Sequence, residues 1–181
     1  VVYNCGGYER IETVHALKDY VDIWLPDFKY QDSYLSLSYS GAKDYFSYAS
    51  QAISQMIAQT GPPRFHTEKA LSSSTQSYCT IMDQGVIIRH MVLPGHKEDS
   101  IRLLSWMAEN LPKNSYYISL LSQYTPSHKS SRFPGLNRRI TTYEYEKVVD
   151  AALNLGLNQG FIQQKSSAKE EYTPPFDLEG I

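Results

Sequence analysis

The sequence is poor in cysteine, and the few cysteines it has are far apart. Cys5 and Cys79 are the two thiols in a chain of 181 residues. A disulfide framework, a zinc site or an iron–sulfur centre needs several thiols at close spacing. We therefore expect no cysteine metal site within this chain, and we expect reduced thiols in a cytoplasmic protein.

Long apolar runs and an excess of charge of one sign are missing as well. The apolar run at residues 85–93 is far below the roughly 20 residues of a membrane-spanning helix. A formal net charge of −2 offers no basic surface for nucleic acid or anionic lipid. We therefore predict neither a membrane nor a nucleic-acid partner. The length suits one domain, which we place at residues 1–164, followed by a charged, proline-containing tail at 165–181.

Short runs rich in β-branched and aromatic residues predict four strands, at residues 1–4, 21–25, 86–93 and 116–121. Apolar residues at helical spacing lie between and after them, at 11–21, 46–57, 101–111 and 141–153. The last helix begins with the capping box Thr141-x-x-Glu144 and ends near Gly156. Residues 61–84 predict a surface excursion or hairpin, and residues 125–139 predict a long loop.

Strands that alternate with helices imply right-handed crossovers and a parallel sheet. The nearly continuous apolar character of residues 86–93 predicts a strand that is buried on both faces. Four β/α units are too few to close a barrel and leave two strand edges exposed. We therefore predict an α/β fold, an open and curved part of a β/α barrel with an apolar inner face, and we expect further strands upstream of Val1.

In parallel β/α folds the functional site lies beyond the carboxyl ends of the strands. Asp27 and Lys29 lie two residues apart at such an end, so both side chains point to one face. A carboxylate beside an ammonium group suits a zwitterionic or ribose-bearing ligand, although a strand-end salt bridge is the alternative. Further polar or glycine-containing clusters follow the other strands: Asn4-Cys5-Gly6-Gly7, residues 89–95, and Gln123-Tyr124.

Arg89 interrupts an apolar strand. An unpaired buried charge is very unfavourable, so we expect Arg89 to pair with Asp27 or with a ligand carboxylate; a purely structural ion pair is the alternative. Its neighbour His90 faces the other side of the strand and is predicted to be a packed histidine. The segment Asn137-Arg138-Arg139 is predicted to be solvated rather than an anion site.

The remaining positions carry weaker signals. Gly6 is predicted to lie in a plain turn with Gly7. Tyr124 has a ring that suits stacking on a flat ligand, in a chain where tyrosines are common. Cys5 has no histidine in an obvious partnering position, so a nucleophilic role is not favoured.

In order and spacing, these strand-end motifs resemble one family. VVYNCGGY (1–8), VDIWLPDFKY (21–30) and RHMVLPG (89–95) are similar to the third, fourth and fifth strands of radical S-adenosylmethionine (SAM) enzymes related to pyruvate formate-lyase activating enzyme. LLSQY (120–124) then corresponds to the sixth strand. LNRRIT (136–141) is similar to a stretch in an uncharacterised branch of these activase-like proteins. The combination of motifs is specific and extends to about Leu157.

The resemblance implies a partial (β/α)6 barrel of which this chain supplies strands three to six. It implies SAM as cofactor and a 4Fe-4S cluster held by three closely spaced cysteines, which this sequence does not contain, so we expect the chain alone to be inactive. Asp27, Lys29 and Arg89 then lie at the SAM pocket, and Asn4 stands where the activase has an aspartate near a cation. The cofactor-binding candidates are Asn4, Cys5, Gly6, Asp27, Lys29, Arg89, Met91, Gln123 and Tyr124.

The implied reaction is reductive cleavage of SAM to a 5′-deoxyadenosyl radical, which abstracts a hydrogen atom from a substrate. In the activases the substrate is a glycine of a partner protein. The implied partners are therefore a glycyl-radical enzyme or another protein substrate, and an electron donor such as flavodoxin or ferredoxin. The sequence identifies no catalytic residue and no metal ligand in this chain.

Two other functions stay open. The chain could be a non-catalytic α/β binding module whose sheet is complete and whose Asp27, Lys29 and Arg89 bind an anionic small molecule. It could also be part of a metal-free barrel hydrolase or aldolase in which Lys29 is a reactive amine. Borohydride trapping of a carbonyl substrate on Lys29 separates the last reading from the others.

Overall fold

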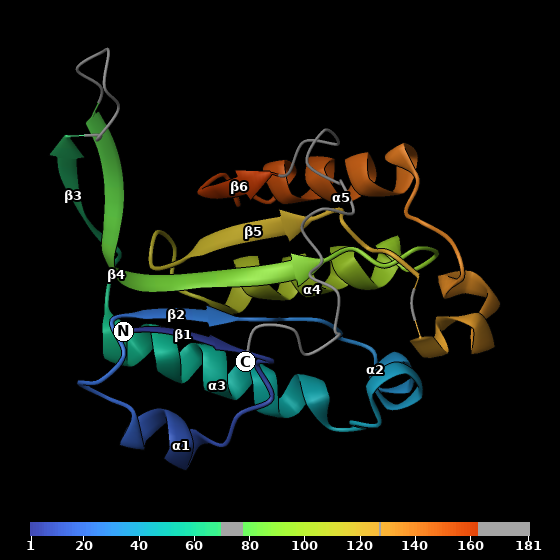
Figure 1. The fold of residues 1–181 in the computed structure, drawn as a ribbon, viewed down its shortest axis with the longest axis horizontal. Helices are drawn as coiled ribbons and strands as arrows, with labels where there is room; N and C mark the ends of the chain where they lie inside the picture. The colour runs from blue at the N-terminus through green and yellow to red at the C-terminus, as the bar shows by residue number, and fades with distance from the viewer. Residues whose placement is uncertain (70–77, 127, 163–181) are drawn as a thin grey trace, which may run out of the picture.

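Strands and helices alternate along the chain (Figure 1). The computed structural model describes residues 1–69, 78–126 and 128–162, so the predicted tail at 165–181 lies outside the described residues. The strands are β1 (Val2–Cys5), β2 (Ile23–Pro26), β3 (Arg64–Lys69), β4 (Tyr78–Met91), β5 (Tyr117–Leu121) and β6 (Gly160–Ile162). The α-helices are α1 (Ile11–Ala16), α2 (Ser33–Ser40), α3 (Tyr45–Thr60), α4 (Lys97–Asn110) and α5 (Thr142–Asn154), with short 3-10 turns η1 (His128–Arg132) and η2 (Pro134–Leu136).

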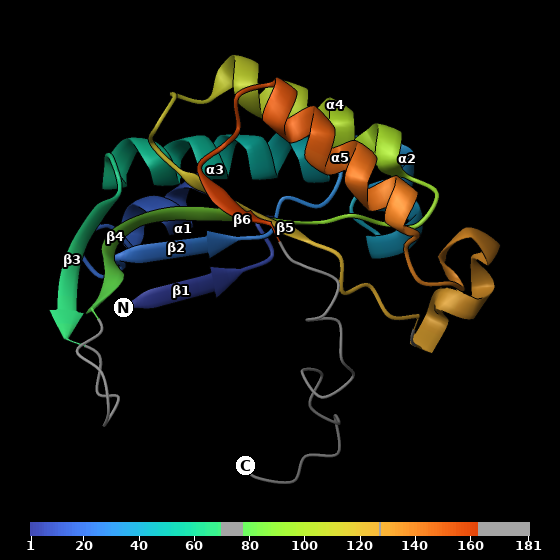
Figure 2. The same ribbon diagram turned by 90° about the horizontal axis from the view of Figure 1, so that it is seen from above.

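Five strands form a parallel sheet in the order β1-β2-β4-β5-β6. Helices α3, α4 and α5 lie together on one side of this curved sheet (Figure 2). Because the strands are parallel, the carboxyl ends of all five lie along the same edge. The predicted α/β fold, an open part of a β/α barrel with parallel strands, is confirmed.

Side chains along the strands alternate between the two faces of the sheet. Trp24 and Phe28 on the β2 side and Ile88 on β4 are at most 1% exposed and form part of the core under the helices. Their neighbours Ile87 and Met91 are only partly buried. The prediction that residues 86–93 are buried on both faces is therefore wrong. The helices cover one face, and the apolar residues of the other face line the inside of the curve.

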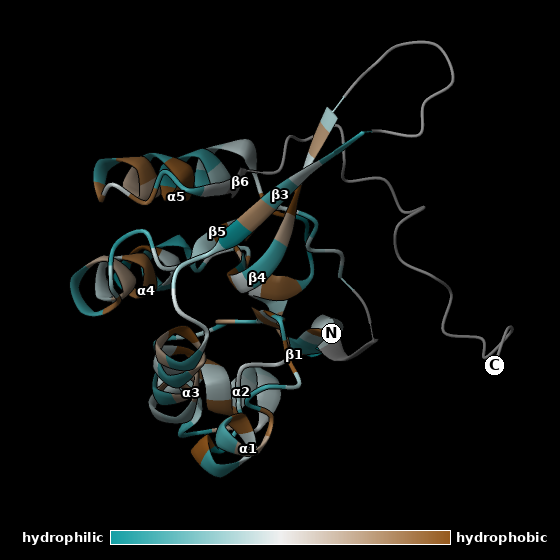
Figure 3. Cartoon of the chain, turned by 90° about the vertical axis from the view of Figure 1, so that its left-hand side faces the viewer, coloured by the Kyte–Doolittle hydropathy of each residue, from teal (hydrophilic) through white to brown (hydrophobic). Residues whose placement is uncertain are grey.

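The hairpin predicted at residues 61–84 is confirmed in its described part, where β3 pairs antiparallel with the first half of β4. It projects away from the helices (Figure 3), and every residue of β3 is exposed. Phe65 contacts Tyr117 edge to face, with ring centroids 5.4 Å apart. This contact ties the base of the hairpin to β5.

Two elements were not predicted. Helix α2 has a serine-rich sequence with weak helix propensity, and it begins where Asp32 accepts hydrogen bonds from the amides of Tyr34 at 2.7 Å and Leu35 at 3.3 Å. Strand β6 has three residues, which is too short for a periodic signal.

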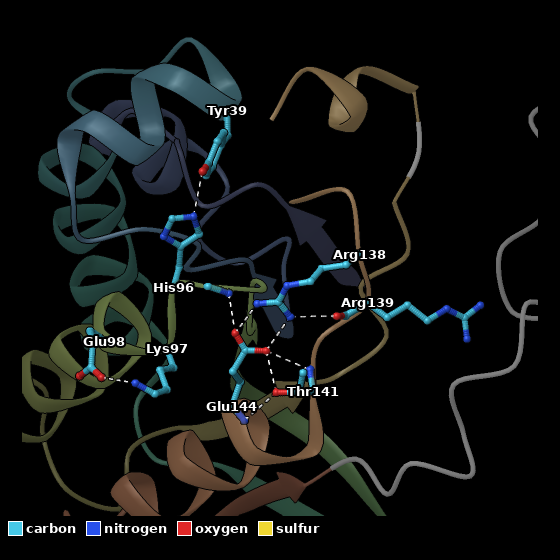
Figure 4. A network of polar contacts seen from close by, with 9 residues as sticks. Tyr39, His96, Lys97, Glu98, Arg138, Arg139, Thr141 and Glu144 are labelled. Atoms are coloured by element: carbon cyan, nitrogen blue, oxygen red, sulfur yellow. Dashed lines mark hydrogen bonds and ion pairs between the residues drawn. The ribbon is translucent and has the colours of Figure 1, made fainter. Parts of the chain in front are cut away.

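The start of α5 is fastened to two neighbouring segments. Thr141 and Glu144 form the predicted capping box. The Glu144 carboxylate also accepts from the Gly95 amide at 2.7 Å and from Nη1 and Nη2 of Arg138 at 2.8 and 2.6 Å (Figure 4). The Arg138 guanidinium holds the pKa of this buried carboxyl well below its usual range. The prediction that Arg138 is simply solvated is therefore incomplete. Arg138 links the segment before α5 to this helix, because the buried Glu144 carboxylate needs a countercharge.

The turn after β1 brings its backbone against the end of β2. Gly7 has φ +75°, and a Cβ at this position would lie 2.0 Å from the carbonyl oxygen of Asp27. Only glycine accepts both the left-handed conformation and this close approach. A Cβ on Gly6, one residue earlier, would meet nothing within 4 Å.

We expect Gly7→Ala to lower the free energy of unfolding by about 2–5 kcal/mol, because left-handed strain adds to a steric conflict with backbone. Urea titration followed by circular dichroism measures the change. Gly6→Ala is the matched control and should stay within about 0.5 kcal/mol of the wild type. Equal effects of the two substitutions would contradict the packing described for Gly7.

We expect Glu144→Gln to lower the free energy of unfolding at pH 7 by about 1–3 kcal/mol, the range for hydrogen bonds to charged groups. The folded-state pKa of Glu144 is depressed, so its stabilisation is full above the ordinary carboxyl pKa and is lost as the pH falls below it. The difference between wild type and variant should therefore narrow between pH 7 and pH 3.5. Glu146→Gln, an exposed position of the same helix, is the control. A gap that stays constant with pH would contradict the assignment.

Candidate functional site

A hollow of about 290 Å³ lies at the carboxyl edge of the sheet. Its wall comes from the ends of β2, β4 and β5 and from the residues that follow them. The lining residues are Asp27, Lys29, Tyr30, Arg89, Met91, Leu93, Leu121 and Tyr124. Five of the predicted candidates are therefore brought to one place, from three strand ends that are distant in sequence.

Charged side chains form one side of the hollow. Nη2 of Arg89 lies 2.5 Å from Oδ1 of Asp27 and 2.6 Å from Oδ1 of Asn4. Nζ of Lys29 lies 3.5 Å from the other carboxylate oxygen of Asp27. The predicted pairing of Arg89 with Asp27 and the predicted common face of Asp27 and Lys29 are confirmed. Two cations against one carboxylate leave a surplus positive charge.

Arg89 keeps unused donor capacity. Its Nε atom is buried and has no hydrogen-bond partner among the described residues. A guanidinium offers donors in a planar fork that matches a carboxylate or phosphate. The hydrogen bonds to Asn4 and Asp27 both come from Nη2, so the donor left for an anionic group in the hollow is the other terminal nitrogen, Nη1, rather than the buried Nε.

The rest of the wall is apolar or aromatic. Met91 and Leu93 follow Arg89 at intervals of two residues, and Leu121 ends β5. The rings of Tyr30 and Tyr124 complete the wall, and both have anchored hydroxyls. Oη of Tyr30 lies 3.0 Å from Oγ of Ser40, and Oη of Tyr124 donates to the Leu136 carbonyl at 2.9 Å. Such a surface suits a flat ring of the size of a nucleobase.

A buried tyrosine holds the backbone from which the charged residues arise. The hydroxyl of Tyr45 accepts from the Lys29 amide at 3.0 Å and lies 2.8 Å from the Asp27 carbonyl and 2.9 Å from the Gly6 carbonyl. Burial raises the pKa of Tyr45 far above its usual value, so the hydroxyl keeps its proton at neutral pH.

His90 holds the same segment from the other side. As predicted, it packs under the helices and is 1% exposed. Its Nδ1 donates to the Phe28 carbonyl at 2.7 Å, and its Nε2 accepts from the Ser100 hydroxyl at 2.8 Å. Burial lowers the pKa of His90, which favours the neutral ring that this donor and acceptor pattern requires.

The segment after Tyr124 is fastened to helices α2 and α5. Phe133 contacts Tyr39 of α2 edge to face at 4.9 Å. Tyr39 is in turn hydrogen-bonded to Nε2 of His96 at 2.8 Å (Figure 4). Burial lowers the pKa of His96, which favours the neutral ring. Together with the ion pair of Arg138 and Glu144, the contact of Phe133 fixes the segment from Phe133 to Arg138 against α2 and α5.

Four candidates do not line the hollow. Asn4 contacts Arg89 from the edge of the site. Cys5 follows Asn4, so it points to the helix-covered side, where burial raises the pKa of its thiol to about 11. Gly6 contributes its carbonyl to Tyr45. Gln123 is exposed and lies beyond the end of β5, where strand alternation no longer directs its side chain.

Sequence reasoning missed several residues of the site. Leu93 and Leu121 follow from the two-residue alternation that places Arg89 and Met91, so extending this pattern would have found them. Tyr30 and Tyr45 gave no signal that separates them from the other tyrosines. Tyr45 lies at the first position of α3, and only the folded chain shows that it reaches the end of β2.

The described part of the chain contains no group of three histidine, cysteine, aspartate or glutamate side chains arranged to hold a metal ion. Within the same ranges, no helix has the length and apolar character needed to cross a membrane.

Comparisons with known proteins support the fold. No protein-family model matches the chain. An uncharacterised protein of Methanocaldococcus jannaschii is 28% identical over 159 residues, which cover 87% of this chain but 39% of that protein. The chain thus spans about two fifths of the length of this relative. The crystal structure of a domain of pyruvate-formate lyase-activating enzyme from Bacteroides vulgatus superposes with a TM-score of 0.56 and 16% identity, covering 86% of this chain and 75% of that domain. The fold of this chain is therefore similar to that of an activating-enzyme domain.

Proposed function

We propose that this chain forms the SAM-binding wall of a radical SAM enzyme of the activase type. One observation carries the proposal: Asp27, Lys29 and Arg89 converge on a hollow whose remaining wall is apolar and aromatic. The similarity of fold to an activating-enzyme domain supports it, although a fold alone does not define a function. The order and spacing of the strand-end motifs support it independently.

The chemistry of the wall fits the parts of SAM. The carboxylate of Asp27 suits an ammonium group or ribose hydroxyls. Lys29 and the unsaturated guanidinium of Arg89 suit the carboxylate of the amino acid. Met91, Leu93 and Leu121, with the two tyrosine rings, suit the adenine. A volume of about 290 Å³ lies at the lower end of the range for ligand sites, as expected of one wall of a larger cavity.

The residues of this chain do not fit the iron–sulfur cluster. Its two cysteines are a buried thiol in β1 and an exposed thiol in the hairpin, whereas the resemblance implies three closely spaced cysteines. We therefore assign no step of this chain to a cluster. In radical SAM enzymes, bound SAM supplies the 5′-deoxyadenosyl radical. The part of this chain is to orient the ligand and to exclude water from one side of it.

The proposal for the whole protein extends to its partners. The hydrogen donor would be a protein substrate such as a glycyl-radical enzyme, and the electron would come from a flavodoxin or ferredoxin in the cytoplasm. The similarity of fold to a domain of an activating enzyme supports a protein substrate.

The geometry disfavours Lys29 as a reactive amine. Its side chain is 42% exposed and is paired with Asp27. Schiff-base lysines are activated by desolvation or by a second cation. Lys29 is not desolvated, and the Asp27 carboxylate bridges it to the nearby cation, Arg89, and compensates its charge. A barrel hydrolase or aldolase is therefore not proposed.

We expect the 181-residue chain to bind S-adenosylhomocysteine, measured by isothermal titration calorimetry without any cluster. Asp27→Asn and Arg89→Gln should each weaken binding by about 10- to 100-fold, the range for hydrogen bonds to charged groups. Affinity for adenosine alone should change less with Arg89→Gln, because adenosine has no carboxylate. Asp150→Asn and Lys147→Gln, on the exposed side of α5, are charge-matched controls. Absence of binding, or equal losses in the controls, would overturn the proposed function.

A further inference from the structure

The segment from Asp27 to Lys29 is held at every backbone polar group between the two charged residues. The Asp27 amide donates to the Cys5 carbonyl at 2.9 Å, and the Phe28 amide donates to the Arg89 carbonyl at 2.8 Å. His90 donates to the Phe28 carbonyl. The Tyr45 hydroxyl is hydrogen-bonded to the remaining two groups, the Asp27 carbonyl and the Lys29 amide.

Tyr45 acts through one hydroxyl on two strand ends. The oxygen accepts from Lys29, and its single hydrogen points to the carbonyls of Asp27 and Gly6, which lie 2.8 and 2.9 Å away. These carbonyls belong to the turns after β2 and β1. No other side chain of the site is hydrogen-bonded to both turns in the described part of the chain.

The tyrosine itself is fixed on a rigid support. It is 3% exposed and opens the 16-residue helix α3. The ring of Tyr8 stacks on it at 5.9 Å and 20°, and Tyr30 meets it edge to face at 5.5 Å. The direction of its hydroxyl is therefore set by packing.

The peptide between Asp27 and Phe28 also leaves little room to move. A Cβ on Gly7 would lie 3.2 Å from the Tyr45 hydroxyl as well as 2.0 Å from the Asp27 carbonyl oxygen. The turn after β1, the end of β2 and the Tyr45 hydroxyl are therefore packed directly against one another. The Asp27 carboxylate lies 2.5 Å from the Arg89 guanidinium. A shift of the Asp27 backbone would therefore disrupt this contact.

We infer that Tyr45 is a positioning residue of the candidate site. Its hydroxyl sets the backbone from which Asp27 and Lys29 reach the ligand, without touching the ligand itself. This inference rests on the proposed function for the identity of the ligand.

Tyr45→Phe tests the inference because it removes the hydroxyl and keeps the ring. We expect the affinity for S-adenosylhomocysteine to fall about three- to tenfold, the equivalent of one hydrogen bond. Tyr116→Phe is the matched control. Tyr116 is also buried, and its hydroxyl contacts the Met107 carbonyl at 3.5 Å, at the opposite end of β5. The Tyr116→Phe variant should bind S-adenosylhomocysteine with the affinity of the wild type, even if its thermal stability falls as much as that of Tyr45→Phe.

A double-mutant cycle separates positioning from a loss of stability. In an Asp27→Asn, Lys29→Gln background, Tyr45→Phe should cause little further loss of affinity, since both groups that it positions have been removed. Its effect on the unfolding temperature should instead persist. Additive losses of affinity would show that Tyr45 acts apart from Asp27 and Lys29 and would overturn the inference.

If the wild-type chain binds no S-adenosylhomocysteine, the proposed function is overturned but the inference about Tyr45 is not. A second measurement tests the inference in that case. Amide hydrogen exchange by NMR reports the Lys29 amide directly. We expect its exchange to accelerate at least tenfold in Tyr45→Phe relative to Tyr116→Phe. Unchanged protection of this amide would refute the role of Tyr45 whatever the ligand.

Discussion

In the part of the chain that the structure describes, helices cover one face of the parallel sheet (Figure 2), and this covering sorts the side chains of the strands. Residues on the covered face enter the core, so they are apolar, such as Trp24 and Ile88, or have hydrogen-bond partners, as His90 has. Their neighbours face the inside of the curve and are free to be polar near the carboxyl edge. Asp27, Lys29 and Arg89 occupy these positions. The candidate site is thus a direct consequence of the two-residue strand period.

A cation on a half-buried surface is stable only with partners nearby, and the partners of Arg89 define the character of the hollow. Asp27 and Asn4 both accept from the same nitrogen, Nη2, which leaves other donors of the guanidinium for a ligand. Lys29 adds a second positive charge. A neutralised pair alone would exert little attraction, whereas this cluster attracts an anionic group and still offers a carboxylate to a cationic one. That combination is the basis for proposing a zwitterionic ligand rather than a simple anion.

The sequence predicted what depends on local pattern and missed what depends on contacts across the fold. The parallel strands, the α5 capping box and the common face of Asp27 and Lys29 all follow from short-range spacing, and each was found. The prediction that residues 86–93 are buried on both faces was wrong because Ile87 and Met91 are apolar but only partly buried. Tyr45 and Arg138 were missed as structural partners because each acts on a segment remote from its own element. No periodicity in a single sequence reports such contacts. The contacts of the hairpin tip and the tail lie outside the described residues.

The two sides of the hollow are held in the same physical manner. On the β2 side, Tyr45 and His90 bind backbone groups of the strand end. On the β4 and β5 side, Glu144 binds the Gly95 amide and Tyr124 binds the Leu136 carbonyl. In each case a side chain satisfies a backbone group of another segment, outside the strand pairing. A wall fixed in this way loses little freedom when a ligand binds. Its charged groups are paired with one another, and this arrangement is consistent with the proposed role of orienting a ligand.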